Sequence, residues 1–162
     1  MINTDAVGAD STAPTQWLAA DLSAAKARGA KRMFVFGHKP AFTYAYASTV
    51  TAAGLDVNPS ARDAFWAVME QYRATYFCGH QHTVNVSQPK GGAYQVIVGS
   101  GGSPFDPKFG TVTANPSTDR DYAWATVRLH ADGGVDILVY GFNGDTTAWG
   151  PTQLLFNPIY LN

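Results

Sequence analysis

The sequence has little charge and a single cysteine. Asp, Glu, Lys and Arg make up 14% of the 162 residues, and the net charge is −1. An ordinary soluble domain carries roughly a quarter of charged residues. No block of like charges occurs, which argues against a nucleic-acid-binding surface and against an anionic membrane as a partner. Cys78 has no second cysteine to pair with, so an internal disulfide is excluded.

Long hydrophobic segments are also missing. No apolar run approaches the length of a membrane span. The first residues, MINTDAVGADS, have neither the basic region nor the apolar region of a signal peptide. As written, the chain is therefore expected in the cytoplasm and without a membrane partner. Its length suits one domain over residues 1–162, with enough material for a core.

Two amphipathic helices alternate with short apolar strands in the first half. Residues 11–29 are typical of a helix that is capped by Ser11 or Thr12 and ends at Gly29, and residues 58–73 predict a second helix. The expected buried faces are Trp17, Leu18, Leu22 and Ala25 in the first helix and Phe65, Trp66, Met69 and Tyr72 in the second. Strands are predicted at residues 1–7, 31–36 and 74–78.

The second half is rich in predicted strands. Residues 83–88 and 93–100 flank a turn and indicate a hairpin, as do residues 122–130 and 135–142. Residues 152–162 predict an edge strand, because proline is disfavoured in a central one. The fold class is therefore α/β: a mixed sheet with two crossover helices, followed by a C-terminal β meander.

Three of the four histidines follow predicted strands directly. His38 comes after residues 31–36, and His80 and His82 come after residues 74–78. Neighbouring parallel strands end at the same edge of a sheet, which is where α/β proteins bind ligands. Imidazole is a common ligand of zinc and iron. The pattern predicts a metal site; the alternative is three ordinary hydrogen-bonded histidines, the interpretation that we adopt for His130.

Other polar groups are interpreted more conservatively. Asp106, Asp119 and Asp121 lie in a predicted loop and are expected to be solvated rather than to bind a metal. The segment GSGGSP lacks the lysine of a phosphate-binding loop and predicts a flexible turn. Cys78 is expected to be a core residue. Tyr44 and Tyr46 either line a substrate pocket or cover the core.

Three segments together resemble a known family. They are TQWLAADLSAAKARGAKRMFVFGHKPAF, RDAFWAVMEQYRATYFCGHQH and YQVIVGSGGSP. They are similar to the second half of a calcineurin-like metallophosphoesterase of the purple acid phosphatase-like type. The resemblance implies half of an α/β/β/α sandwich and a metal-dependent phosphoric ester hydrolase, of the phosphomonoesterase or phosphodiesterase type. It implies that His38 and His80 bind one metal ion and His82 the other, as metal ligands and catalytic residues. Zinc is favoured over iron or manganese. Members of the family are often secreted, so the resemblance leaves the localisation open.

The chain departs from the family in its carboxylates. The Asp-x-His, Gly-Asp-x-x-Asp and Gly-Asn-His-Asp or -Glu motifs of the family's first half do not occur. We expect the chain to correspond to the second half of the domain, with Met1 an internal or engineered start and an incomplete metal site. The alternatives are a catalytically inactive metal-binding half-domain that oligomerises or needs a partner, and an interaction domain without enzymatic activity. Because the two helices cover one face of the predicted sheet, we also expect a homodimer or oligomer that buries the other face.

Overall fold

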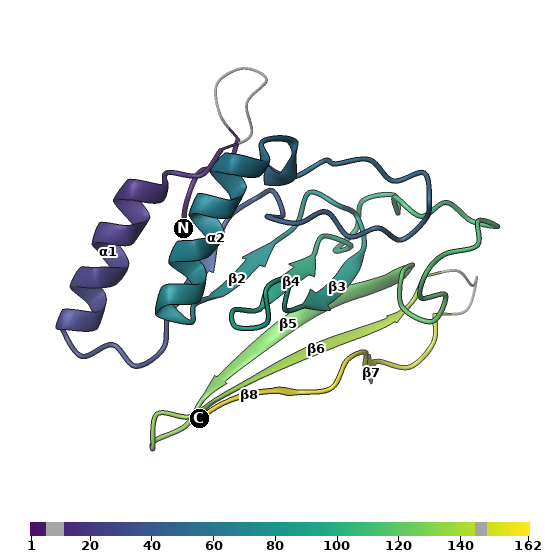
Figure 1. Cartoon of the computed structure of the whole chain (residues 1–162). Helices are drawn as coiled ribbons and strands as arrows, with labels where there is room; N and C mark the ends of the chain where they lie inside the picture. Colours follow the sequence, from purple (N-terminus) through teal and green to yellow (C-terminus); the bar gives the residue numbers. More distant parts are fainter. Residues whose placement is uncertain (6–11, 145–148) are drawn as a thin grey trace.

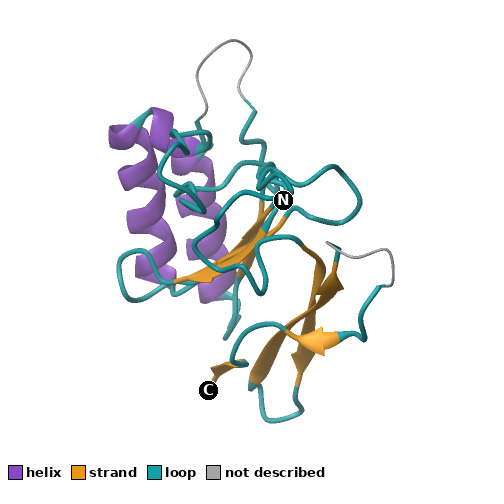
Figure 2. Ribbon diagram, turned by 90° about the vertical axis from the view of Figure 1, so that its right-hand side faces the viewer, coloured by secondary structure: helices purple, strands orange, loops and turns teal. Residues whose placement is uncertain are grey.

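The chain folds into three layers: one layer of two helices and two layers that are each a β-sheet. The computed structural model describes residues 1–5, 12–144 and 149–162. Helices α1 (Thr15–Ala27) and α2 (Pro59–Tyr72) lie on one face of the first sheet. That sheet contains β1 (Phe34–Phe36), β2 (Thr75–Cys78), β3 (Val84–Ser87) and β4 (Gln95–Val98). The second sheet contains β5 (Asp121–Leu129), β6 (Val135–Asn143), β7 (Gln153–Leu154) and β8 (Ile159–Leu161). Figure 2 shows the order helices, first sheet, second sheet.

The first sheet is mixed and has the strand order β1-β2-β4-β3. Strands β1, β2 and β4 are parallel, and β3 pairs with β4 in the antiparallel direction. The register places Phe36 of β1 beside Phe77 of β2. The α/β class is confirmed, and the loops after β1 and β2 leave the sheet at the same edge.

The second sheet is antiparallel and covers the face of the first sheet that is turned away from the helices. Strands β5 and β6 form the predicted hairpin, and the C-terminal tail pairs with β6 twice, as β7 and β8. A buried cluster fills the space between the sheets and includes Phe77, Val84, Val96, Ala123, Val135, Ile137 and Val139. The expectation of a broad uncovered sheet face, from which we predicted an oligomer, is therefore wrong.

The two helices lie where the sequence predicted them, but the cap and the buried face of α1 differ from the prediction. Asn58 caps α2 as predicted, since its side chain accepts a hydrogen bond from Ala61 N at 3.4 Å. Helix α1 begins after Pro14 with no side-chain cap, so Thr12 does not cap it, and Ser11 lies outside the described residues. Trp17 is 57% exposed instead of buried, because the apolar face of α1 is narrow and centred on Leu18 and Leu22.

The start of the chain is not a strand in residues 1–5, whereas residues 6 and 7 of the predicted strand lie outside the described part. Ile2 N donates one backbone hydrogen bond to Phe36 O at 2.8 Å. Two residues later the contact is made by a side chain instead of the backbone. The Thr4 hydroxyl accepts hydrogen bonds from His38 N at 3.0 Å and from Lys39 N at 2.8 Å. Within the residues that the structure describes, neither helix is long and apolar enough to cross a membrane.

Candidate functional site

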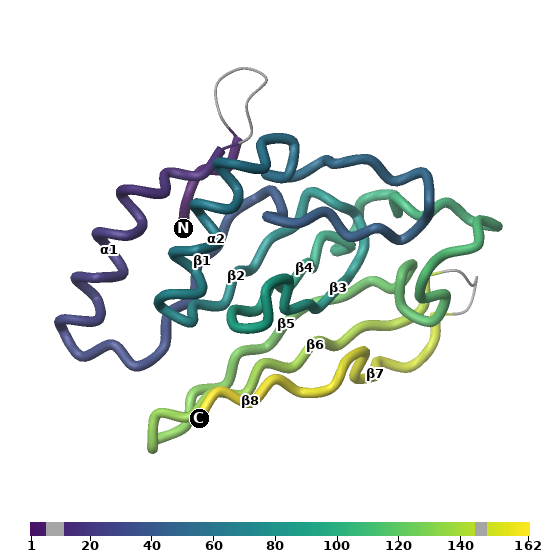
Figure 3. Tube along the Cα trace, in the orientation of Figure 1, coloured from purple at the N-terminus to yellow at the C-terminus, as the bar shows by residue number. Residues whose placement is uncertain are grey.

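The loops after β1 and β2 bring the two Gly-His segments together. Gly37 N donates to Phe77 O, and Gly79 N donates to His38 O, each at 3.0 Å. A Cβ atom at Gly37 would collide with the hydroxyl of Tyr76, which donates to Lys39 O at 2.6 Å. The glycine before His38 therefore permits a close approach of the loop to β2. Figure 3 shows β1 and β2 as neighbouring segments of the trace.

His38 and His80 form a pair. The distance between His38 Nε2 and His80 Nδ1 is 3.0 Å, and the rings meet edge to face at an interplanar angle of 78°. One hydrogen bond between two imidazoles needs one donor nitrogen and one acceptor nitrogen. His80 has a positive φ of 66°, which turns the chain sharply so that its ring reaches across to His38.

The electrostatic setting favours a neutral His80. Burial lowers the pKa of this imidazole below its usual value, and the neighbouring His38 and Lys39 lower it further. Asp5 and Asp106 oppose these effects. A neutral imidazole is the form that binds a metal ion.

His82 is held separately, by the loop after β4. Its backbone N–H donates to Asp106 Oδ2 at 2.9 Å, and its Nδ1 lies 2.9 Å from Pro104 O. Because a carbonyl oxygen can only accept, Nδ1 carries a proton, and in a neutral ring Nε2 is then the nitrogen with the free lone pair. Metal-binding histidines are commonly oriented by such a hydrogen bond from their other nitrogen.

Gln81, between the two histidines, was not singled out from the sequence. It is buried, its side chain accepts from Tyr44 N at 2.7 Å, and it donates to Tyr44 O at 3.0 Å. The half-buried His80 and His82 line one cleft of about 500 Å³, to which Gln81 between them also contributes. Other residues of this cleft are Tyr46, Thr49, Thr51 and Asp106. The signal available in the sequence was the pattern His80-Gln81-His82, in which a glutamine alternates with two possible metal ligands.

The two tyrosines have different roles. Tyr46 lines the cleft. Its pKa is raised, mainly by burial and to a smaller extent by the negative charge of Asp106. The Tyr44 hydroxyl instead donates to Asp119 at 2.8 Å, and burial together with this bond raises the pKa of Tyr44. Tyr44 thus fixes the loop after β1, and Tyr46 is the one placed to meet a ligand.

Two of the three carboxylates that were expected to be solvated in a loop, Asp119 and Asp121, are not solvated, and Asp121 is the first residue of β5 instead of a loop residue. Asp106 is half-buried. Asp119 and Asp121 are buried, because the loop folds over them and gives Asp119 two donors, the Tyr44 hydroxyl and Asn115 N. Asp106 orients His82. Cys78 is buried, as predicted for a core residue, and burial raises the pKa of its thiol. His130 lies 2.9 Å from Asp136 Oδ2, on β6.

The three candidate histidines thus form a pair and a separate third ring. Across residues 1–5, 12–144 and 149–162, no group of three or more His, Cys, Asp or Glu side chains is arranged to hold one metal ion. The assignment of His38, His80 and His82 as ligands stays a prediction. No protein-family model matches the sequence, and no curated protein sequence matches it significantly.

Proposed function

We propose that this chain is a metal-dependent phosphoric ester hydrolase of the metallophosphoesterase type. The observation that carries the proposal is the pairing of His38 and His80 at the ends of two parallel strands, with His82 in the same cleft as His80. This arrangement matches the resemblance of the sequence, which implies that His38 and His80 share one metal ion and His82 binds another. The three observed layers would then be part of the family's four-layer sandwich.

The donor set fits a cation that prefers nitrogen. His38 Nε2 and His80 Nδ1 face each other at 3.0 Å, whereas two nitrogens bound to one tetrahedral zinc at about 2.05 Å are about 3.3 Å apart. A cation could replace the shared proton with a small separation of the rings. His82 offers Nε2, because its Nδ1 donates to Pro104 O. Zinc is therefore favoured over iron or manganese.

The protein's own residues would bind and orient the substrate. When bound, the metal ion supplies Lewis-acid stabilisation of the phosphoryl oxygens and lowers the pKa of water. Thr49, Thr51 and Tyr46 line the cleft beside His80 and His82 and carry hydroxyl groups that can donate to a phosphate ester. Pro104 and Asp106 keep His82 in one orientation.

Hydrolysis of 4-nitrophenyl phosphate tests the proposal. Activity is expected only with added zinc, manganese or iron, and the double variant His80→Ala/His82→Ala should lose it. The variant His130→Ala is the control, because His130 pairs with Asp136 on β6. Turnover that persists in a chelator, or in the double variant, would overturn the mechanism.

A second candidate is a catalytically inactive metal-binding domain. In the part of the chain that the structure describes, no carboxylate completes a group of three with the histidines, and a bridging carboxylate is what holds two cations together in the family. Metal binding without turnover would favour this candidate. If the chain showed neither metal binding nor turnover, the remaining candidate would be an interaction domain without enzymatic activity.

We also propose that the chain forms a homodimer through the edge of the first sheet at β1. Phe36 is 47% exposed and stacks on Phe77 with a centroid distance of 5.1 Å. An apolar groove of about 350 Å³ runs from Phe36 past Val98 to Val127. A second hollow, lined by Phe36 and His38, adjoins it. A partner copy at this edge would lie beside His38.

A further inference from the structure

The outer face of the second sheet carries a row of aromatic side chains. Residues on β5 and β6 alternate between the inter-sheet core and this outer face. Val139 points inward, whereas Tyr122, Trp124 and Phe142 line a pocket on the outer face, which Ala123 also borders. The two helices cover the first sheet instead (Figure 2). Trp124 is 42% exposed and Trp149 is 73% exposed.

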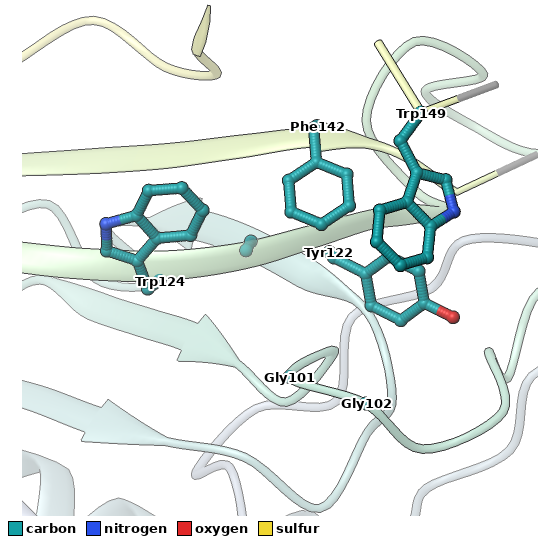
Figure 4. A pocket seen from close by; sticks show the side chains of 7 residues that line it. Gly101, Gly102, Tyr122, Trp124, Phe142 and Trp149 are labelled. Carbon is teal, nitrogen blue, oxygen red and sulfur yellow. The ribbon is translucent and has the colours of Figure 1, made fainter. Parts of the chain in front are cut away.

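These rings form one wall of a pocket of about 470 Å³, within the range of about 300–1,000 Å³ that is usual for small-molecule sites. Figure 4 shows Trp124, Phe142, Trp149 and Tyr122 with the loop of Gly101 and Gly102 opposite. Gly101 has open space where a side chain would begin. The pocket is therefore bounded by ring faces on one side and by side-chain-free backbone on the other.

The ring planes of the pocket are tilted to one another. The angle is 34° between Phe142 and Trp149 and 45° between Tyr122 and Phe142. Trp124 stacks at 28° on Tyr140, which lies beside the pocket and does not line it. A cage for a quaternary ammonium group needs rings that face the cation from several directions. Rings that are tilted by 34° and 45° along one wall give an open platform, which suits a ligand with a flat apolar face.

The polar groups of the pocket limit further which classes of ligand it can bind. None of the lining residues that the structure describes is charged, so a phosphate backbone or a carboxylate would find no cationic partner among them. The Tyr122 hydroxyl and the indole nitrogens of Trp124 and Trp149 lie at the edges of the rings (Figure 4). A matching ligand is neutral, with C–H groups on a flat face and hydroxyl groups around its rim.

We infer that this pocket binds a pyranose ring of a neutral carbohydrate. The weakly positive C–H groups of one sugar face would stack on the negative faces of the rings. The sugar hydroxyls would hydrogen-bond to Tyr122, to the indole N–H groups and to the backbone of Gly101 and Gly102. The sugar can be a free oligosaccharide or part of a polysaccharide, because both present the same ring.

The proposed carbohydrate site is separate from the histidine site but uses the same loop after β4. Phe105 in that loop packs on Tyr122 with a centroid distance of 4.8 Å. The next residue, Asp106, binds His82 N. The carbohydrate site does not depend on metal binding or on hydrolysis, so it can be tested with metal-free protein.

Affinity electrophoresis in gels that contain neutral polysaccharides is the test. The panel is a soluble β-1,4-glucan, xylan, galactomannan and an α-glucan, with an empty gel as reference. The wild-type chain should be retarded by at least one polysaccharide. Trp149→Ala and Trp124→Ala should each weaken the apparent affinity by about tenfold, since a stacked ring and its buried area contribute about 1.4 kcal/mol. Trp17→Ala is the matched control, because Trp17 is an exposed tryptophan on α1.

A variant that fills the pocket provides a second test in case Trp149→Ala or Trp124→Ala fails to fold. Gly101→Leu adds a side chain into open space, so it should keep the wild-type melting temperature and lose retardation. Tryptophan fluorescence titrations with the retarding sugar and with choline complete the test. Retardation by none of the polysaccharides would overturn the inference, as would a response to choline alone. Equal retardation of wild type, Trp149→Ala and Gly101→Leu would also contradict it.

Discussion

His38 Nε2 lies 3.0 Å from His80 Nδ1, although the two histidines are 42 residues apart in the sequence. The contact exists because β1 and β2 are parallel neighbours and both loops leave the sheet at one edge. Two imidazoles that share one hydrogen bond cannot both be charged without losing it. This relationship underlies the first prediction.

Stability should depend on the protonation of His80. Its pKa is lowered in the folded state, chiefly by burial, so the unfolded chain binds more protons just below pH 6.5. The stabilisation is fully present above the unfolded pKa of about 6.5 and is lost as the pH falls through the lower folded value. We expect urea melts between pH 5 and 7.5 to show a smaller pH dependence for His80→Asn than for wild type. Asparagine tolerates the positive φ at this position. Identical pH profiles would show that His80 is not the titrating group.

Asp106 should control metal affinity without binding the metal itself. It accepts a hydrogen bond from His82 N and lies 3.8 Å from His82 Nδ1. Loss of such an orienting group costs about 10–100-fold in metal affinity. Zinc competition with a chromophoric chelator should show this loss for Asp106→Ala and a smaller one for Asp106→Asn, which keeps an acceptor oxygen. Asp63→Ala, at an exposed ion pair with Arg62, should leave affinity unchanged. An unchanged affinity in Asp106→Ala would separate His82 from the metal.

Gln95 should be essential for the loop after β1. Its side-chain oxygen accepts from Ala41 N at 2.8 Å and Phe42 N at 3.0 Å, and its nitrogen donates to Phe42 O at 2.8 Å. Replacement by leucine leaves these buried groups without partners, and each unsatisfied group costs about 1–3 kcal/mol. Gln95→Leu should lower the free energy of unfolding by about 3 kcal/mol, measured in urea. The control Gln88→Leu, at an exposed position, should change it by about 0.5 kcal/mol or less. A neutral Gln95→Leu would contradict the role of this clamp.

The proposed dimer should depend on Phe36. Light scattering at micromolar concentration should give twice the 17.3 kDa mass of the chain. Phe36→Glu places a charge in the apolar groove at β1 and should yield a monomer. Trp17→Glu, also an exposed aromatic position but on α1, should remain dimeric. A monomeric wild type at this concentration would refute the dimer.

The local patterns in the sequence were sufficient to predict the class of the fold. Two runs that each end in Gly-His correspond to β1 and β2, and the hairpins of the second half are present as expected. What could not be predicted is long-range packing. The placement of the second sheet over β2 and β4 depends on side chains such as Val96 and Ile137 meeting across two sheets, and no local pattern encodes that contact.

The candidate site shows the same division. The spacing of His38, His80 and His82 predicted one edge of the sheet, and all three lie in the loops there. The pairing of only two rings could not be foreseen, because it depends on the positive φ of His80 and on the hold of Pro104 and Asp106 on His82. The restraints on His82 come from a loop more than 20 residues further along the chain.

Anomalous diffraction at the zinc edge, from crystals soaked in zinc, tests the metal site most directly. The account predicts a peak between His38 Nε2 and His80 Nδ1, about 2.0–2.1 Å from each nitrogen. A second, weaker peak is expected at His82 Nε2. A zinc peak at His130 and Asp136 with no density beside His38 or His80 would contradict the account.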